Sequence, residues 1–163
     1  MAITKQKKAD ILAGLGEAAK NATSMVFVGF TRLTVAEMTK LRRALREDGV
    51  SVKVAKKRLI GKALTDAGIP GAMPALPGEV AVAYSAGDST APARGIHAFV
   101  KEFKDKLVIL GGVFDGSFAD QGKMQEIATI PPVPVLRGMF VNVINSPIQG
   151  LVIALNAVAE KKQ

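Results

Sequence analysis

The sequence predicts an α+β protein: a four-stranded antiparallel sheet of the split β-α-β (ferredoxin-like) type with helices, followed by a C-terminal amphipathic helical tail. The sheet is predicted because residues 24–55 and residues 79–114 each follow the order strand, helix, strand. The tail is predicted because the end of the chain is apolar and has helical spacing. Alternating elements also fit a doubly wound parallel sheet, and strand order is not readable from one sequence; we favour the split arrangement.

The first half of the predicted head begins with a helix over 5–20, where apolar residues recur at helical spacing. The apolar run 24–30 is typical of a buried strand. Thr34 and Glu37 have the spacing of a capping box. A helix is therefore expected to begin there and to end near Gly49.

The second half begins with the alternating residues 50–55, which predict a strand. A short helix should follow and stop at Gly68. Prolines and glycines make 69–78 a loop. Two further strands are expected over 79–85 and 107–114.

The connection between these last two strands should be a helix capped by Asp88 or Ser89. A weaker helix is expected within 119–130, where it is closed by the prolines that follow. We place the domain boundary at this point. Residues 1–130 are expected to form a globular domain and residues 131–163 a helical tail.

The composition favours a polyanionic partner. The chain of 163 residues has 22 Lys and Arg against 14 Asp and Glu, a net charge of +8, and its pI is about 9.9. Cysteine is absent, which excludes disulfides and thiol catalysis and fits a reducing compartment. The N-terminus has no apolar run of the kind found in secretory signals, so we expect a cytoplasmic protein.

Motifs for catalysis are missing from the sequence. The segment GSFADQGKM fails the spacing of a phosphate-binding loop, and no G-x-S-x-G motif is present. His97 is the single histidine and has no cysteine or second histidine with which to share a metal. We therefore expect no enzyme, no catalytic residue, no metal and no cofactor.

Positive charge is concentrated in residues 41–64, which hold eight Lys or Arg and two Asp or Glu. Arg42 and Arg46 repel each other four positions apart on a helix. Cations at the start of the next helix oppose its dipole, whereas a bound phosphate would make the whole arrangement favourable. A solvated charged face is the alternative. Because aromatic residues are only 5% of the chain, we expect contacts to the backbone of a folded RNA rather than base stacking. The predicted RNA contacts are Lys5, Lys7, Lys8, Arg32, Arg42, Arg43, Arg46, Lys53, Lys56, Lys57, Arg58 and Lys62.

The tail has no charged residue over the 22 positions 138–159. A membrane-spanning helix is disfavoured because five polar side chains share a narrow arc of the helical wheel and Pro147 interrupts the segment. An amphipathic helix with a broad apolar face is expected instead. Ser146 and Pro147 resemble a cap and first turn, so two helical segments are expected, 134–145 and 147–160. The apolar face would either pack on its own domain or lie in grooves of other proteins.

Three blocks resemble the family of the bacterial large-subunit ribosomal protein L-ten, the stalk-base protein. They are LTVAEMTKLRRALREDGVSVKVAKKRLIGKAL (33–64), GGVFDG (111–116), and IATIPPVPVL followed by SPIQGLV (127–152). The resemblance implies a structural component of the large ribosomal subunit. Its head would bind 23S rRNA at the stalk base, beside ribosomal protein L-eleven, and its tail would carry dimers of the acidic stalk protein. Those dimers recruit GTPase translation factors, and family members commonly also bind a leader of their own messenger RNA.

The resemblance also assigns individual residues. The family pattern Lys-Asn-Thr-Leu corresponds to residues 56–59, where cations replace Asn and Thr, and the family's Arg-Gly pair corresponds to Arg32 and Leu33. Two stalk dimers are expected, one on each helical segment, and no membrane partner. A free-standing RNA-binding regulator or chaperone with an intramolecularly packed tail is the alternative. The expected stalk-binding residues are Leu136, Phe140, Val143, Ile144, Ile148, Leu151, Val152, Leu155 and Val158.

Overall fold

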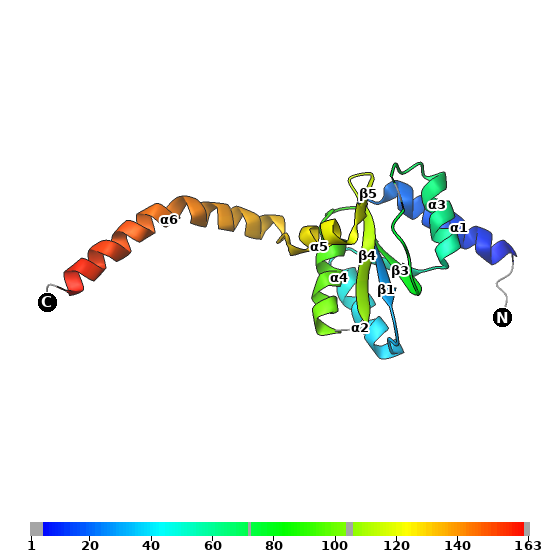
Figure 1. Cartoon of the computed structure of the whole chain (residues 1–163), viewed down its shortest axis with the longest axis horizontal. Coiled ribbons are helices and arrows are strands. Elements are labelled where there is room, and N and C mark those ends of the chain that lie inside the picture. The colour runs from blue at the N-terminus through cyan, green and yellow to red at the C-terminus, as the bar shows by residue number, and fades with distance from the viewer. Residues whose placement is uncertain (1–4, 72, 104–105, 162–163) are drawn as a thin grey trace. The chain divides into compact units, whose positions relative to one another are not determined.

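The computed structural model describes residues 5–71, 73–103 and 106–161, apart from the side chains of Lys5 and Lys7. The chain forms two compact units, Met1–Ile130 and Pro131–Gln163. The first unit contains five helices and five strands in its described part (Figure 1). They are α1 (Lys5–Asn21), β1 (Ser24–Phe30), α2 (Val35–Glu47), β2 (Ser51–Val54), α3 (Lys57–Asp66), β3 (Glu79–Ser85), α4 (Ala91–Glu102), β4 (Leu107–Phe114), β5 (Ser117–Asp120) and α5 (Gln121–Thr129).

The strands form one antiparallel sheet in the order β2-β3-β1-β4-β5. The first four have the order of a split β-α-β fold, with β1 and β3 at the centre, which confirms the α+β prediction. Residues 24–30, 79–85 and 107–114 are strands with the predicted bounds.

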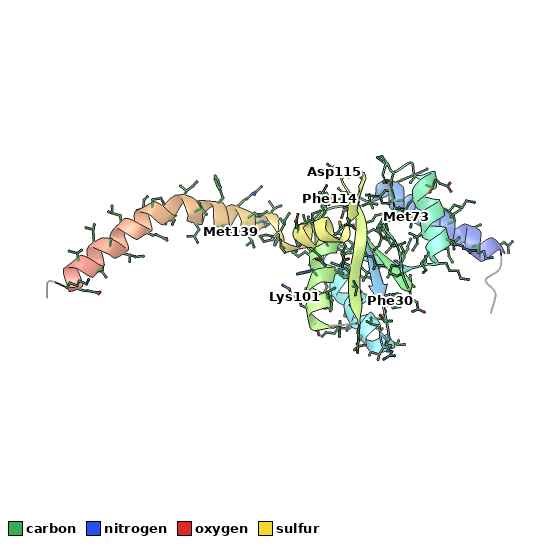
Figure 2. The ribbon with its side chains drawn as sticks, in the orientation of Figure 1. Phe30, Met73, Lys101, Phe114, Asp115 and Met139 are labelled. Carbon is green, nitrogen blue, oxygen red and sulfur yellow. The ribbon has the colours of Figure 1, made fainter. Side chains whose placement is uncertain are left out.

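The fifth strand corrects the expected count of four. β5 pairs with β4 through a two-residue turn at Asp115 and Gly116, whose φ angles are 51° and 72° (Figure 2). Asp-Gly between two strands is a strong hairpin signal, because both positions need positive φ. The sequence carried this signal, which the prediction of four strands overlooked; the weak helix expected within 119–130 follows β5 as α5.

Helices cover both faces of the sheet. Alternate residues of β1 point to opposite sides, so Val26 and Val28 pack with α2, α4 and α5, whereas Met25 and Phe27 pack with α1 and α3. All four side chains are at most 3% exposed. The chain therefore buries a separate apolar cluster on each face.

The start of α2 follows the predicted capping box. The Thr34 hydroxyl accepts a hydrogen bond from the backbone N–H of Glu37 at 3.3 Å, and the Glu37 carboxylate accepts one from the backbone N–H of Thr34 at 2.8 Å. The cap of α4 differs from the prediction. Thr90 is the N-cap residue, and Asp88 instead accepts from the Thr90 N–H at 2.9 Å.

The second unit contains one helix, α6 (Val133–Glu160), with Pro147 inside it. The expected division at Ser146 and Pro147 is therefore wrong. A proline inside a helix removes one backbone hydrogen bond and favours a bend, but it does not have to end the helix. Figure 1 shows α6 bent along its length. By length and composition alone, α6 is also apolar enough to cross a bilayer.

Candidate nucleic-acid interface

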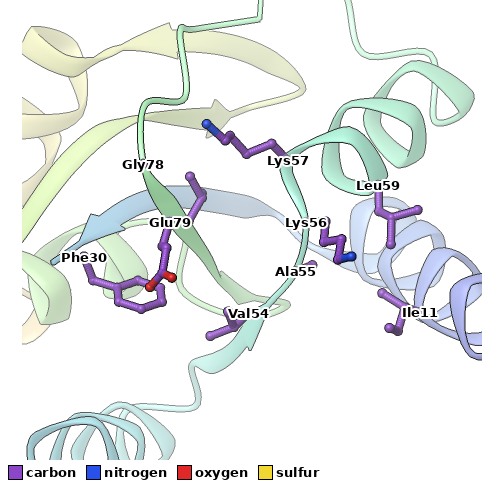
Figure 3. A pocket seen from close by; sticks show the side chains of 10 residues that line it. Ile11, Phe30, Val54, Ala55, Lys56, Lys57, Leu59, Gly78 and Glu79 are labelled. Carbon is purple, nitrogen blue, oxygen red and sulfur yellow. The ribbon is translucent and has the colours of Figure 1, made fainter. Parts of the chain in front are cut away.

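The edge strand β2 borders two adjoining hollows. One, of about 530 Å³, opens between α1 and α2 and is lined by Arg42, Arg46 and Lys53. The other, of about 440 Å³, opens where β2 passes into α3 and is lined by Lys56 and Lys57 (Figure 3). We call the two hollows together the β2 groove. Both are lined by the same three residues, Ile11, Val54 and Ala55.

The cations of the β2 groove lie where local electrostatics opposes them. Arg42 and Arg46 are exposed and four residues apart on α2. Lys56 is the N-cap residue of α3 and makes no side-chain capping bond, and Lys57 is the first residue of that helix. The dipole of a helix disfavours positive charge at this end. An anion bound here would remove both sources of repulsion.

The ion pairs of the protein do not involve the cations of the β2 groove. Across the described residues, three ion pairs occur within 4.0 Å, and their cations are Lys40, Arg94 and Lys106. All three cations lie outside residues 41–64. Asp10 and Glu79 also line the two hollows, but among the described residues neither forms an ion pair, so the cations of the β2 groove remain available to a partner.

Lys53 has contacts inside the protein as well as a place in the groove. Its Nζ donates a hydrogen bond to the backbone carbonyl of Gly14 at 3.2 Å and lies 5.4 Å from the centre of the Tyr84 ring. A cation over an aromatic face is attracted by the ring quadrupole. Lys53 therefore joins α1 to the edge of the sheet.

Other predicted cations are not brought into the groove. Arg43 lies on a different side of α2, where it borders a hollow with Lys40 and Glu47. Arg58 and Lys62 are exposed on α3 and do not line the groove, and Lys8 is exposed on α1. The side chains of Lys5 and Lys7 lie outside the described residues.

Arg32 is exposed in the turn between β1 and α2, and its φ angle is 54°. This left-handed conformation favours glycine, because other residues experience a steric clash at Cβ. The resemblance matched the family's glycine to Leu33, the residue that follows, whereas the left-handed conformation in this turn lies at Arg32.

All nine predicted stalk-binding side chains of α6 are exposed, from 40% for Leu136 to 70% for Val143. None of the residues of α6 is buried. Figure 2 shows side chains projecting along the whole helix, with Met139 labelled. Soluble proteins rarely expose so large an apolar surface unless it binds something.

Comparison with known proteins identifies the family. Residues 3–101 match the model of the family "Ribosomal protein L10", and residues 134–163 match the model "Ribosomal protein uL10 C-terminal region". The chain is 38% identical over 159 residues to the large ribosomal subunit protein uL10 of Staphylococcus haemolyticus, covering 98% of this chain and 93% of the relative. It is 37% identical over 161 residues to that of Pelotomaculum thermopropionicum, covering 99% and 91%. The chain belongs to the ribosomal protein L10 family.

Membership of the L10 family confirms the resemblance seen in the sequence. It places the chain among the large-subunit proteins of the bacterial cytoplasmic ribosome, which are structural proteins and not enzymes. The first matching region contains the β2 groove residues from Asp10 to Val80, and the second contains most of α6.

Some residues of the β2 groove carried no signal in the sequence. Phe30 and Glu79 lie at the ends of two neighbouring strands and face the same hollow as Lys56. Each looked like an ordinary strand residue. Only the register of the sheet, which pairs Phe30 with Glu79, shows that they meet.

Proposed function

We propose that this L10-family protein is the base of the ribosomal stalk. Its first unit binds 23S rRNA through the β2 groove, next to ribosomal protein L-eleven, and could bind a leader of its own messenger RNA in the same way. Its second unit, α6, carries dimers of the acidic stalk protein, which in turn recruit translation GTPases. The observation that carries this proposal is the exposure of the apolar face of α6.

The RNA-binding half is supported by the charge of the β2 groove. Arginine and lysine side chains that lack acidic partners attract phosphates, and the counterions released on binding add to the affinity. Four of the groove's cations are Arg42 and Arg46 on α2 and Lys56 and Lys57 at the start of α3, the two helices that β2 connects. Cations on neighbouring segments can contact successive phosphates of one RNA strand.

The stalk-binding half is supported by α6. Phe140 and Ile144 lie before Pro147, and Leu151 and Leu155 lie after it, and all four are at least 60% exposed. Apolar side chains at these spacings are the anchors with which a helix enters a groove of another protein. Pro147 lies between these two sets within α6, which supports two dimers.

The experiment that tests the proposal removes residues 134–163. The shortened protein should still bind a large-subunit rRNA fragment but should no longer capture purified acidic stalk dimers in a pull-down. Native mass spectrometry of the full chain with excess dimer should show two dimers bound.

Retained capture by the shortened protein would contradict the role of α6. The free-standing RNA regulator with a packed tail predicts a different result: the full chain captures no stalk dimer, and deletion of the tail changes the stability of the head.

A further inference from the structure

One end of the β2 groove lies beside an uncovered piece of β3. The pairing of β2 with β3 ends where Val54 faces Ala81, whereas β3 itself begins at Glu79. Glu79 and Val80 therefore have no neighbour from β2. The hollow of about 440 Å³ occupies this place, between the end of β2 and the start of α3 (Figure 3).

The walls of this hollow are apolar. Phe30 and Val54 line it together with Ile11 and Leu59. Val54 is 46% exposed although it belongs to a strand, so its side chain is open to solvent at this point. Small-molecule sites typically have a volume of this order, apolar walls and a few polar groups that fix the orientation of the ligand.

The polar groups of the hollow carry opposite charges. Glu79 is exposed, and Figure 3 shows its carboxylate beside the Phe30 ring, with the Lys56 and Lys57 side chains extending from the start of α3. Among the described residues, no Lys or Arg nitrogen lies within 4.0 Å of the Glu79 carboxylate. The hollow thus offers an acceptor and two cations that do not neutralise each other.

We propose that this hollow binds one unpaired guanine base of the RNA, with Glu79 reading the base and Lys56 and Lys57 holding the adjoining phosphates. This inference rests on the proposed function, since it names what one part of the β2 groove recognises. A carboxylate has two acceptor oxygens. The Watson–Crick edge of guanine presents two neighbouring donors, N1–H and the N2 amino group, whereas the other bases present a donor beside an acceptor. That edge is free only in an unpaired nucleotide.

The small number of aromatic residues is compatible with such a site. Binding of successive bases needs a row of aromatic side chains, but one base needs only one ring and aliphatic walls. Phe30 supplies the ring, and Ile11, Val54 and Leu59 supply the walls.

The test measures the full chain by fluorescence anisotropy against three labelled RNA heptamers. One is all uridine, one has a central guanosine, and one has a central inosine, which lacks the N2 amino group. The guanosine heptamer should bind at least about fivefold more tightly than the uridine heptamer, and inosine should lose most of this preference. Glu79→Gln should bind the guanosine and uridine heptamers equally, because an amide has only one acceptor oxygen.

A matched control is Glu47→Gln, which makes the same change of charge on α2 outside the hollow and should keep the preference for guanosine. Equal binding of the three heptamers by the unaltered protein would overturn the inference, and so would a preference that survives Glu79→Gln. The proposed function is judged separately, by salt-dependent binding of large-subunit RNA, which Glu79→Gln should leave with an unchanged salt slope. A result against guanine binding in the hollow is therefore distinguishable from a result against RNA binding by the β2 groove.

Discussion

At the scale of single residues, the Glu37 carboxylate is held by two neighbouring residues of the head. Its Oε1 lies 2.6 Å from Lys106 Nζ, and its Oε2 accepts from the Thr34 N–H at 2.8 Å and from the Thr34 hydroxyl at 2.9 Å. The Lys106 hydrogen bond, followed by the Thr34 bonds, lowers the pKa of Glu37 from 4.5 to about 2. Glu37 thus closes the start of α2 and joins it to the residue before β4.

The first prediction concerns the acid stability of the head. Because the folded pKa of Glu37 is lower than its value in the unfolded chain, the unfolded state binds more protons between these values. The stabilisation is complete above about pH 4.5 and is lost as the pH falls from about 4.5 to about 2. Glu37→Gln should therefore reduce the pH dependence of the unfolding midpoint in this window. Glu17→Gln, at an exposed carboxylate without an ion-pair partner among the described residues, should leave that dependence unchanged.

The second prediction uses the φ angle of 54° at Arg32. Arg32→Gly and Arg32→Ala remove the same charge, but only glycine is relaxed in the left-handed conformation. The glycine variant should be more stable than the alanine variant by about 1 kcal/mol in urea unfolding. Both variants should lose the same amount of RNA affinity. An alanine variant as stable as the glycine variant would show that the turn is not strained.

At the scale of elements, the contact between α2 and α4 depends on a missing side chain. A Cβ added at Gly95 would lie 2.4 Å from Cδ2 of Leu45, which is fully buried in the core. Gly95→Ala should therefore destabilise the protein by roughly 1–3 kcal/mol in denaturant unfolding. Gly16→Ala is the control, because its Cβ would meet no atom within 4 Å in α1, and it should be neutral or slightly stabilising. Equal effects of the two substitutions would contradict the close approach of α2 and α4.

Elements whose signals are local were predictable from the sequence. The strands 24–30, 79–85 and 107–114 are apolar runs bounded by turn residues, and the start of α2 is fixed by Thr34 and Glu37. The tail was divided wrongly because Ser146 and Pro147 also fit the start of a helix. Only the continuous backbone of α6 shows that the proline lies inside one.

The candidate site was predictable in composition but not in geometry. The sequence showed that cations gather in 41–64, since charge is visible in the residue letters. It did not show that Arg43 lies apart from Arg42 and Arg46, or that Lys53 bonds to Gly14 of α1. Those facts depend on which helix packs against which face of the sheet, and contacts between distant segments leave no periodic pattern in a sequence.

At the scale of the whole molecule, each unit has one kind of unsatisfied surface. Among the described residues, the cations of the β2 groove in the first unit form no ion pair, and the apolar side chains of α6 in the second unit are exposed. Each surface would be unfavourable in an isolated protein, because like charges repel and exposed apolar groups order water. The proposed partners, an RNA for the first surface and a protein for the second, would remove both costs. The two surfaces thus support the proposed role of the molecule within an assembly.

The last prediction tests whether the RNA affinity comes from the cations of the β2 groove or from the positive charge of the whole chain. Replacing Arg46, Lys56 and Lys57 with alanine removes three charges that line the β2 groove. Replacing Lys20, Lys101 and Lys123, which are exposed on α1, α4 and α5, removes the same three charges elsewhere. If the groove binds RNA phosphates, only the first variant should reduce the slope of log affinity against log salt, by roughly 0.7–0.9 for each lost contact. Net charge alone predicts equal slopes for the two variants, because a diffuse field depends on the sum of charges and not on their place. Titration of both variants with the same large-subunit rRNA fragment at several salt concentrations therefore decides whether affinity comes from a located site or from the overall charge.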